Sequence, residues 1–272
     1  MSAHVARDAG GRCAAIIACC LLALVACTPR PPDVSAPAVD SRGWQYQLQG
    51  RVDTAVDTGT FIVDGFDVDA ATVADLQNRG RTVICYINAG AKEDWRPDAG
   101  RYPEEVVGDP LDGWKGERWL DIRRIDAISP ILAERFDMCR SKGFTGVEAD
   151  NVDGYTQDSG FPLTADDQLR FNRALAALAH ERSMTIGLKN DLDQVAALVG
   201  DFDFAVNESC VEYRECEALA PFTAHGKPVL HVEYDLDTNA FCPVTERLKF
   251  LSIRKPLDLN ATVQPCPVGS RS

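Results

Sequence analysis

The sequence predicts an α/β fold, a single (β/α)8 TIM barrel domain that follows an export signal and a proline-rich tether. Short β-rich runs alternate with helical stretches along the whole domain, which is the pattern of parallel strands joined by crossover helices. About 230 residues follow the tether, enough for one large core, and no internal repeat or second linker divides them. An open doubly wound sheet is the alternative, but QLQGRVDT after the first strand contains no glycine-rich phosphate loop.

Residues 1–26 are interpreted as a secretory signal peptide, because Arg7 and Arg12 precede an apolar run that is too short to span a bilayer. The run ends in LVAC, which resembles a bacterial lipobox, where cleavage precedes the cysteine and a lipid is attached to it. Cys27 is therefore the predicted lipidation site. An ordinary signal peptide cleaved after Ala26 is the alternative.

Residues 27–43 are interpreted as the lipidated cysteine and a flexible linker. Prolines keep this linker extended, and it has too few apolar residues to pack. The predicted (β/α)8 domain spans residues 44–272. We expect this arrangement to attach the protein to the cell envelope, at the periplasmic face or at the outer-membrane or extracellular face. The lipid is then its only contact with a membrane.

Eight runs rich in β-branched and aromatic residues are predicted to be strands. In order, they span residues 44–50, 60–66, 82–90, 144–150, 184–190, 202–208, 228–234 and 248–254. Helical patterns are predicted between them at residues 69–80, 128–143, 164–183, 191–200 and 210–226. Gly143 is expected to cap the end of the second helix, and Thr164 with Asp167 to form a capping box at the start of the third.

The charge and the cysteines narrow the possible partners and cofactors. A formal net charge of −13 makes nucleic acid an unsuitable partner and favours a cationic ligand. Six cysteines lie in the domain, and an even number in an exported chain suggests disulfides. The spacing favours the pairs Cys85 with Cys139, Cys210 with Cys216, and Cys242 with Cys266. Zinc is a weak alternative, because no CxxC motif is present.

Polar residues gather at the ends of the predicted strands. In a (β/α)8 barrel, catalytic groups come from the carboxyl ends of the strands and the loops that follow. Isolated buried charges are costly, so packing alone does not explain polar residues at seven of eight strand ends. They form an expected cup of acids, amides and one lysine: Gln47 and Gln49, Asp64 and Asp67, Tyr86 and Asn88, Glu148 and Asp150, Lys189 and Asn190, Asn207 and Glu208, and Glu233 and Asp235.

The chemistry that these residues allow is carboxylate chemistry. No Ser-His-Asp, Cys-His, HxH or HExxH arrangement is visible, and DNVDG lacks the ligands of a calcium loop, so we expect neither a metal nor a cofactor. Cleavage of a glycosidic bond needs one carboxyl group that gives a proton to the leaving oxygen and one carboxylate that faces the oxocarbenium-like carbon. Asp150 and Glu208, at the ends of the fourth and sixth strands, are the predicted pair. A structural salt bridge, for instance to Lys189, is the alternative.

Six motifs resemble glycoside hydrolase family 114, the endo-α-1,4-polygalactosaminidase family: CYINAGAKEDWRPDA, GWKGERWLDIR, GFTGVEADNVDGY, GLKND, FDFAVNESCVEYREC and HVEYD. The resemblance covers Trp44 to about Asp258. It implies a TIM barrel with insertions, no metal, hydrolysis of α-1,4-linked galactosamine polymer, and catalysis by Asp150 and Glu208. The chain departs from the family pattern at Glu148-Ala149, where aspartate and proline are usual, and at Asn88, where serine is frequent.

The expected partner is an amino-sugar polysaccharide bound by a monomer. Galactosamine units without acetyl groups carry ammonium charge, which the acidic cup would attract. Predicted substrate contacts are Asp64, Asp67, Tyr86, Asn88, Trp95, Glu148, Asn151, Tyr155, Lys189, Asn207, Glu233 and Asp235, with Trp95 as the best candidate for stacking on a sugar face.

The sequence leaves the mechanism and the function class partly open. Asp150 as nucleophile with Glu208 as general acid and base gives retention of configuration, whereas a wider gap between the two groups would give inversion. A non-catalytic sugar-binding envelope lipoprotein, or a hydrolase of another cationic amino-sugar glycan, remains the alternative.

Overall fold

The structure is a computed structural model that describes residues 42–267. The predicted signal peptide, the lipidation site Cys27 and most of the linker lie outside the described residues, as do residues 268–272. Between residues 42 and 267, no helix is long and apolar enough to cross a membrane.

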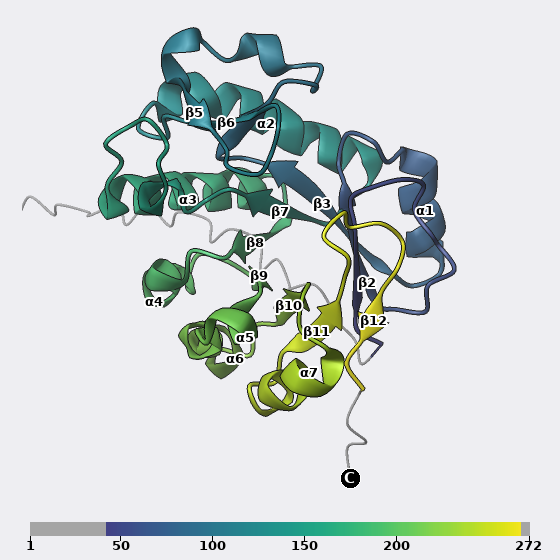
Figure 1. Ribbon diagram of the computed structural model, residues 1–272. Coiled ribbons are helices and arrows are strands. Elements are labelled where there is room, and N and C mark those ends of the chain that lie inside the picture. The colour runs from purple at the N-terminus through teal and green to yellow at the C-terminus, as the bar shows by residue number, and fades with distance from the viewer. Residues whose placement is uncertain (1–41, 268–272) are drawn as a thin grey trace, which may run out of the picture. The chain divides into compact units, whose positions relative to one another are not determined.

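The predicted (β/α)8 barrel is confirmed. Eight parallel strands form the wall in the order β1-β2-β3-β7-β8-β9-β10-β11, with β12 (Gln264–Pro265) added antiparallel to β11 (Figure 1). All eight predicted strands are present but shorter: β1 Trp44–Gln47, β2 Thr60–Asp64, β3 Thr82–Asn88, β7 Gly146–Asp150, β8 Thr185–Lys189, β9 Phe204–Glu208, β10 Val229–Glu233 and β11 Leu251–Arg254. Their near-continuous burial is typical of parallel strands covered on both faces.

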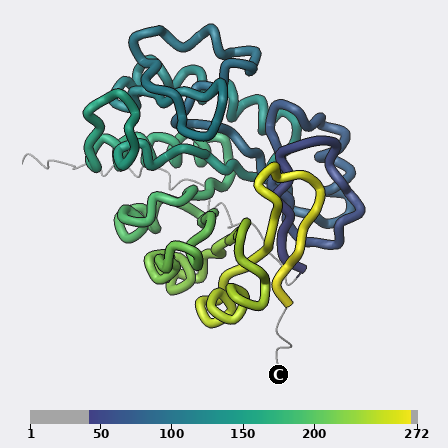
Figure 2. Tube along the Cα trace, viewed as in Figure 1, coloured from purple at the N-terminus to yellow at the C-terminus, as the bar shows by residue number. Residues whose placement is uncertain are grey.

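Helices surround the outer face of this sheet (Figures 1 and 2). The capping box at Thr164 and the left-handed C-cap at Gly143, with φ of 97°, are confirmed. The helical stretch predicted at residues 210–226 is wrong as a single element, because Arg214 adopts a left-handed conformation that ends its first turn. The α-helices are α1 Ala70–Asn78, α2 Ile125–Lys142, α3 Ala165–Glu181, α4 Val195–Leu198, α5 Cys210–Tyr213, α6 Ala220–Ala224 and α7 Thr238–Arg247. The sequence did not predict α7.

Strand alternation divides the core into two layers. One face of each strand packs against the helices, where Phe61, Val83 and Val147 belong to the larger apolar cluster. The other face fills the barrel, where Tyr46, Ile84 and the neighbouring rings form a separate cluster. Which layer a strand residue joins therefore depends on its odd or even position in the strand.

The barrel closes between β1 and β11 without a strand ladder. Instead, the Trp44 indole donates to the carbonyl of Leu251 at 2.8 Å. Lys255 Nζ donates to Gln45 Oε1 at 2.9 Å and to the carbonyl of Asn260 at 2.6 Å. Side chains and the segment after β11 thus replace the missing strand-to-strand hydrogen bonds.

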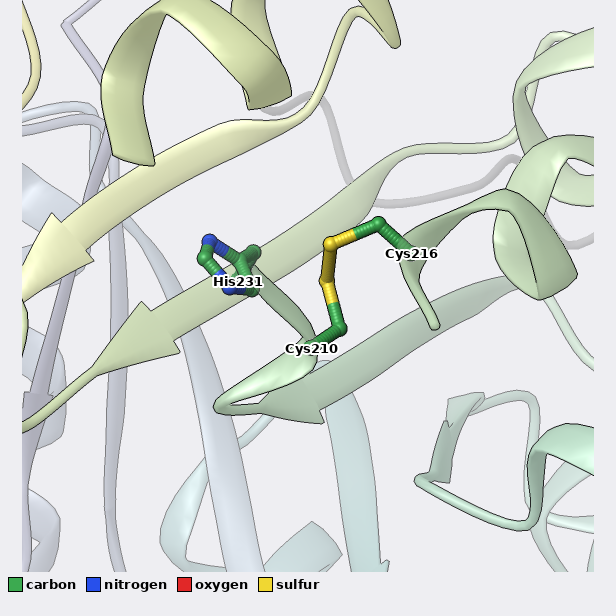
Figure 3. A group of neighbouring side chains, drawn as sticks. All are labelled: Cys210, Cys216 and His231. Carbon is green, nitrogen blue, oxygen red and sulfur yellow. A yellow bond between two sulfur atoms is a disulfide. The ribbon is translucent and has the colours of Figure 1, made fainter. Parts of the chain in front are cut away.

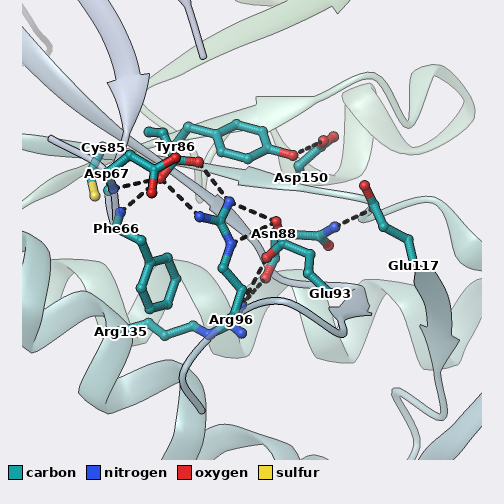
Figure 4. Close-up of polar contacts among 12 residues, drawn as sticks. Phe66, Asp67, Cys85, Tyr86, Asn88, Glu93, Arg96, Glu117, Arg135 and Asp150 are labelled. Atoms are coloured by element: carbon teal, nitrogen blue, oxygen red, sulfur yellow. Dashed lines mark hydrogen bonds and ion pairs between the residues drawn. The ribbon is translucent and has the colours of Figure 1, made fainter. Parts of the chain in front are cut away.

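A three-stranded antiparallel sheet is inserted between β3 and α2, and the sequence did not predict it. It contains β4 Ala91–Glu93, β5 Val107–Pro110 and β6 Glu117–Leu120, in the order β4-β6-β5. Arg96 connects this insertion to the barrel, since its guanidinium donates to Asp64 of β2 at 2.6 Å. The same guanidinium donates to Glu93 of β4 at 2.9 Å (Figure 4). The insertion places Trp95 and Trp119 at the carboxyl end of the barrel strands.

The three predicted disulfides are confirmed. Cys85–Cys139 joins β3 to α2, Cys210–Cys216 closes the loop after β9, and Cys242–Cys266 ties the C-terminal segment to α7. The last of these supports the segment that seals the barrel.

Replacing both Cys242 and Cys266 by serine should lower the free energy of unfolding by about 3 kcal/mol, because the cross-link restricts a long unfolded loop. The residues are 24 positions apart, against 6 for Cys210 and Cys216. The shorter pair should therefore contribute only about 2 kcal/mol. Urea unfolding followed by tryptophan fluorescence measures both, and a larger loss for the shorter pair would contradict this ranking.

Candidate active site

A cavity of about 850 Å³ opens at the carboxyl end of the barrel strands. It continues into a second cavity of about 580 Å³, because Trp114, Asp153, Asn190 and Glu208 line both. The two cavities form one cleft across the mouth of the barrel, on the side where this fold places its active sites.

Lys189 lies at the centre of the floor of this cleft. Its side chain is only 3% exposed, and its Nζ donates to Tyr46 Oη at 3.1 Å, Glu148 Oε1 at 3.2 Å and Asp150 Oδ1 at 3.1 Å. Glu208 Oε2 lies 3.3 Å from the same nitrogen. Burial alone would lower the pKa of Lys189, but the carboxylates around it raise that pKa well above its usual range.

Asp150 and Glu208, the predicted catalytic pair, face each other across Lys189. The two distances to Nζ, 3.1 and 3.3 Å, add up to 6.4 Å, so the nearest oxygens of the two carboxyl groups are no farther apart than that. Asp150 also accepts hydrogen bonds from Tyr86 Oη at 2.8 Å (Figure 4) and from the Asn151 amide at 2.9 Å. Glu208 accepts a bond from the Tyr234 hydroxyl. Both groups are partly exposed to the cleft, by 19% and 29%.

Glu148 lies one layer deeper than Asp150 on the same face of β7. It is fully buried and binds Tyr46 Oη at 2.9 Å as well as Lys189. Burial raises the pKa of Glu148 to about 7, although the nearby ammonium opposes this shift. The residue therefore supports Lys189 from below and does not line the cavity.

Several other carboxyl groups of the site have raised pKa values. Burial, reinforced by neighbouring Asp150, raises the pKa of Asp153 to about 6. Burial also raises the pKa of Asp191 to about 7, with Asp153 adding to it, and that of Glu117 to about 7, with Glu93 adding to it. Like charges crowd this site, and a bound cation would relieve their repulsion.

The structure brings most of the predicted site residues to the cleft. Asp64, Asp67, Tyr86, Trp95, Asn151 and Lys189 line the first cavity, and Tyr155 lines the second. Asp64 is already engaged by Arg96, so its carboxylate also has a structural role.

Five predicted substrate contacts do not line the cleft. Asn207 and Glu233 occupy the outward-facing positions of β9 and β10, since their neighbours Val206 and Val232 fill the barrel. Asp235 lies beyond the end of β10 and is exposed. The remaining two are covered: Glu148 by the layer above it, and Asn88 by the inserted sheet, whose Glu117 accepts a 2.8 Å bond from its amide.

Sequence reasoning missed Tyr46 and Tyr234, which both contact the carboxylate network. Tyr234 follows Val232 by two positions, so strand alternation could have placed it in the barrel in preference to Glu233. The sequence placed Asn190 at the end of a strand but assigned it no role. In the structure, its Oδ1 accepts a hydrogen bond from the backbone amide of Glu208 at 3.0 Å.

One group of described residues has the composition of a metal site, namely Cys210, Cys216 and His231 (Figure 3). Their potential ligand atoms lie within 4.8 Å of one another. However, the two sulfur atoms form a disulfide and so offer no thiolate. His231 instead bonds Glu233 and Ser252, each at 3.0 Å, inside the helical layer.

A (β/α)8 barrel with two carboxyl groups facing each other in an open cleft is an arrangement typical of glycoside hydrolases. The chain belongs to glycoside hydrolase family GH114, whose model matches residues 26–271, and it is a glycoside hydrolase.

Two solved structures are similar to the chain, and the first of them supports this assignment. Ega3 from Aspergillus fumigatus, solved in complex with galactosamine, is 40% identical, with a TM-score of 0.81 over 85% of this chain and 97% of that one. The glycoside hydrolase domain of PelA from Pseudomonas aeruginosa shares the fold, at 14% identity and a TM-score of 0.64 over 81% of this chain and 97% of that one. No curated protein sequence matches the chain significantly.

The raised pKa values predict that the fold loses stability as the pH rises from 5 to 8. Glu148 has a folded pKa of about 7 against an ordinary value of 4.5, so its contribution is complete below pH 4.5 and is lost as the pH passes 7. The loss should be on the order of 3 kcal/mol for this group.

Thermal unfolding at several pH values measures this effect. The Glu148→Gln variant, which cannot ionise, should lose clearly less stability over the same range. An identical pH dependence in the variant and the parent protein would contradict the role of Glu148.

Proposed function

We propose that the protein hydrolyses α-1,4-linked galactosamine-containing polysaccharide with Asp150 as nucleophile and Glu208 as general acid and base. The observation that carries the proposal is the shared contact of both carboxyl groups with Lys189, which limits the gap between their nearest oxygens to 6.4 Å. Contact of both groups with one ammonium group favours the short carboxyl separation of retaining glycosidases, about 5 to 5.5 Å, over the separation of about 6.5 to 9.5 Å that inverting ones need to admit a water molecule.

The hydrogen bonds of Asp150 and Glu208 suggest which group is the nucleophile and which is the general acid and base. Asp150 is held by three donors, Lys189, Tyr86 and the Asn151 amide, which fix its oxygens for attack on the anomeric carbon. Glu208 is the more exposed of the two groups and contacts both Tyr234 and Lys189, so its carboxyl group lies where it can pass a proton to the glycosidic oxygen. Lys189 stabilises the carboxylates as their charges change during the reaction.

The charge of the first cavity supports an amino sugar as the substrate. Ten carboxyl residues line it, against two cationic residues, Arg96 and Lys189. A sugar with a free ammonium group supplies the missing positive charge, whereas a neutral or anionic sugar does not. Galactosamine is the ligand of Ega3, the 40% identical relative.

Two further expectations belong to this proposal. The mature protein is attached to the envelope through a lipid on Cys27, which labelling with a radioactive fatty acid would detect. The barrel domain acts as a monomer, which analytical ultracentrifugation would test.

Replacing Asp150 by Asn or Glu208 by Gln should reduce turnover at least 1,000-fold while leaving the fold intact, because each change removes one essential carboxyl group. The assay counts new reducing ends from partially deacetylated galactosaminogalactan, with chitosan beside it. Asp235→Asn, at the same end of the barrel but outside the cleft, is the matched control. Near-normal activity of either catalytic variant would refute the assignment, and tight binding without cleavage by the parent protein would favour a binding module.

Hydrolysis should release the new reducing end in the α configuration, since a double displacement at Asp150 retains the anomeric form. Proton NMR recorded in the first minutes of the reaction distinguishes the two anomers before mutarotation. An initial β product would show direct attack by water and would exclude Asp150 as nucleophile.

A further inference from the structure

The two halves of the cleft differ in which catalytic carboxyl group they contact. Asp150 lines only the first cavity, Glu208 lines both, and Tyr234, which bonds Glu208, lines only the second. This asymmetry bears on the direction in which a polysaccharide chain lies.

The chemistry of double displacement turns the asymmetry into a polarity. A carboxylate oxygen of Asp150 forms a bond to the anomeric carbon as the bond from that carbon to the glycosidic oxygen breaks, and Glu208 gives its proton to that oxygen. The sugar that is attacked must therefore lie where both carboxyl groups reach it, in the first cavity. The sugar that leaves with a new hydroxyl group needs only the proton donor, and it fits the second cavity.

We propose that the second cavity is the leaving-group side of the cleft and binds galactosamine units on the reducing-end side of the cleaved bond. The non-reducing side of the chain then lies in the first cavity, toward Trp95. This inference rests on the proposed function, and it adds the orientation of the chain and a binding site around Tyr213.

Exposed apolar side chains provide the first support. Four large hydrophobic residues are strongly exposed within residues 42–267: Trp95, Trp114, Tyr213 and Leu257. All four line the cleft, and Tyr213, which is 67% exposed, lines only the second cavity. Apolar surface that gathers at one site marks a binding surface, and flat rings suit the apolar faces of sugars.

The charges of the second cavity provide independent support. Five carboxyl residues line it, Asp153, Asp191, Asp193, Glu208 and Glu215, and no lysine or arginine does. Asp191 is only 4% exposed, and its Oδ1 has no hydrogen-bond partner. Burial and the neighbouring Asp153 raise its pKa, so a nearby ammonium group would stabilise its ionised form.

The test compares two aromatic variants on galactosamine oligomers labelled at the reducing end. Tyr213→Ala removes contact on the leaving-group side, so the cut should move toward the labelled end, with kcat/KM about fivefold lower. Trp95→Ala removes contact on the other side, so the cut should move away from the label. Glu212→Ala, an exposed neighbour on α5 that lines neither cavity, is the control and should leave the pattern unchanged.

The outcomes separate the orientation from the proposed function. Shifts in opposite directions as stated support the orientation, whereas reversed shifts, shifts in one direction or an unchanged pattern for Tyr213→Ala overturn it. If the parent protein cuts no galactosamine oligomer, the proposed function fails. In that case, the second site is tested by binding alone. The affinity of the Asp150→Asn variant for oligomers is compared with that of the double variant that also carries Tyr213→Ala, and equal affinities overturn the second site.

Discussion

One buried ammonium group holds three carboxyl groups together, and the site depends on it. Lys189 on β8 contacts Glu148 and Asp150 on β7 and Glu208 on β9. Burying any of these charges alone would be very costly, so the contacts require β7, β8 and β9 to align correctly. The observed pairing of Ala149 with Leu188 and of Lys189 with Val206 provides that alignment. A slip of one residue would turn the lysine out of the barrel.

Closure of the barrel is part of the same constraint. Tyr46 of β1 donates to Glu148 and accepts from Lys189, so the first strand supplies the base of the network. That strand is not paired with β11, and the bonds of Trp44 and Lys255 hold it in place. A weakened seam would therefore disturb the lysine as well as the overall stability. In this fold the active site is built at the carboxyl ends of the strands and on the loops that follow them, and here a strand far in sequence from the proposed catalytic pair helps to position that pair.

The sequence predicted the strands and the end of the barrel at which the cleft opens, because both follow from simple regularities. Buried parallel strands read as short apolar runs, and polar residues such as Asp150 and Lys189 at their ends are hard to explain otherwise. The sequence could not show how deep in the barrel each side chain lies. Glu148 and Asp150 are two positions apart on one face of β7, yet only Asp150 reaches the cavity. The inserted sheet was missed because its strands are only three or four residues long, too short for a periodic pattern.

The charge balance of the site is the physical basis for the proposed preference for a cationic substrate. One ammonium faces three carboxyl groups on the floor, and Arg96 is already occupied by Asp64 and Glu93 in the wall. Each ammonium that a sugar brings into the cleft reduces the repulsion among the remaining carboxylates. The second cavity has no cationic side chain of its own, so an ammonium group there meets carboxyl groups without a competing positive charge. Discrimination between free and acetylated amino sugars would then involve the units that depart as well as those held in the first cavity, where carboxyl groups also outnumber Lys189 and Arg96.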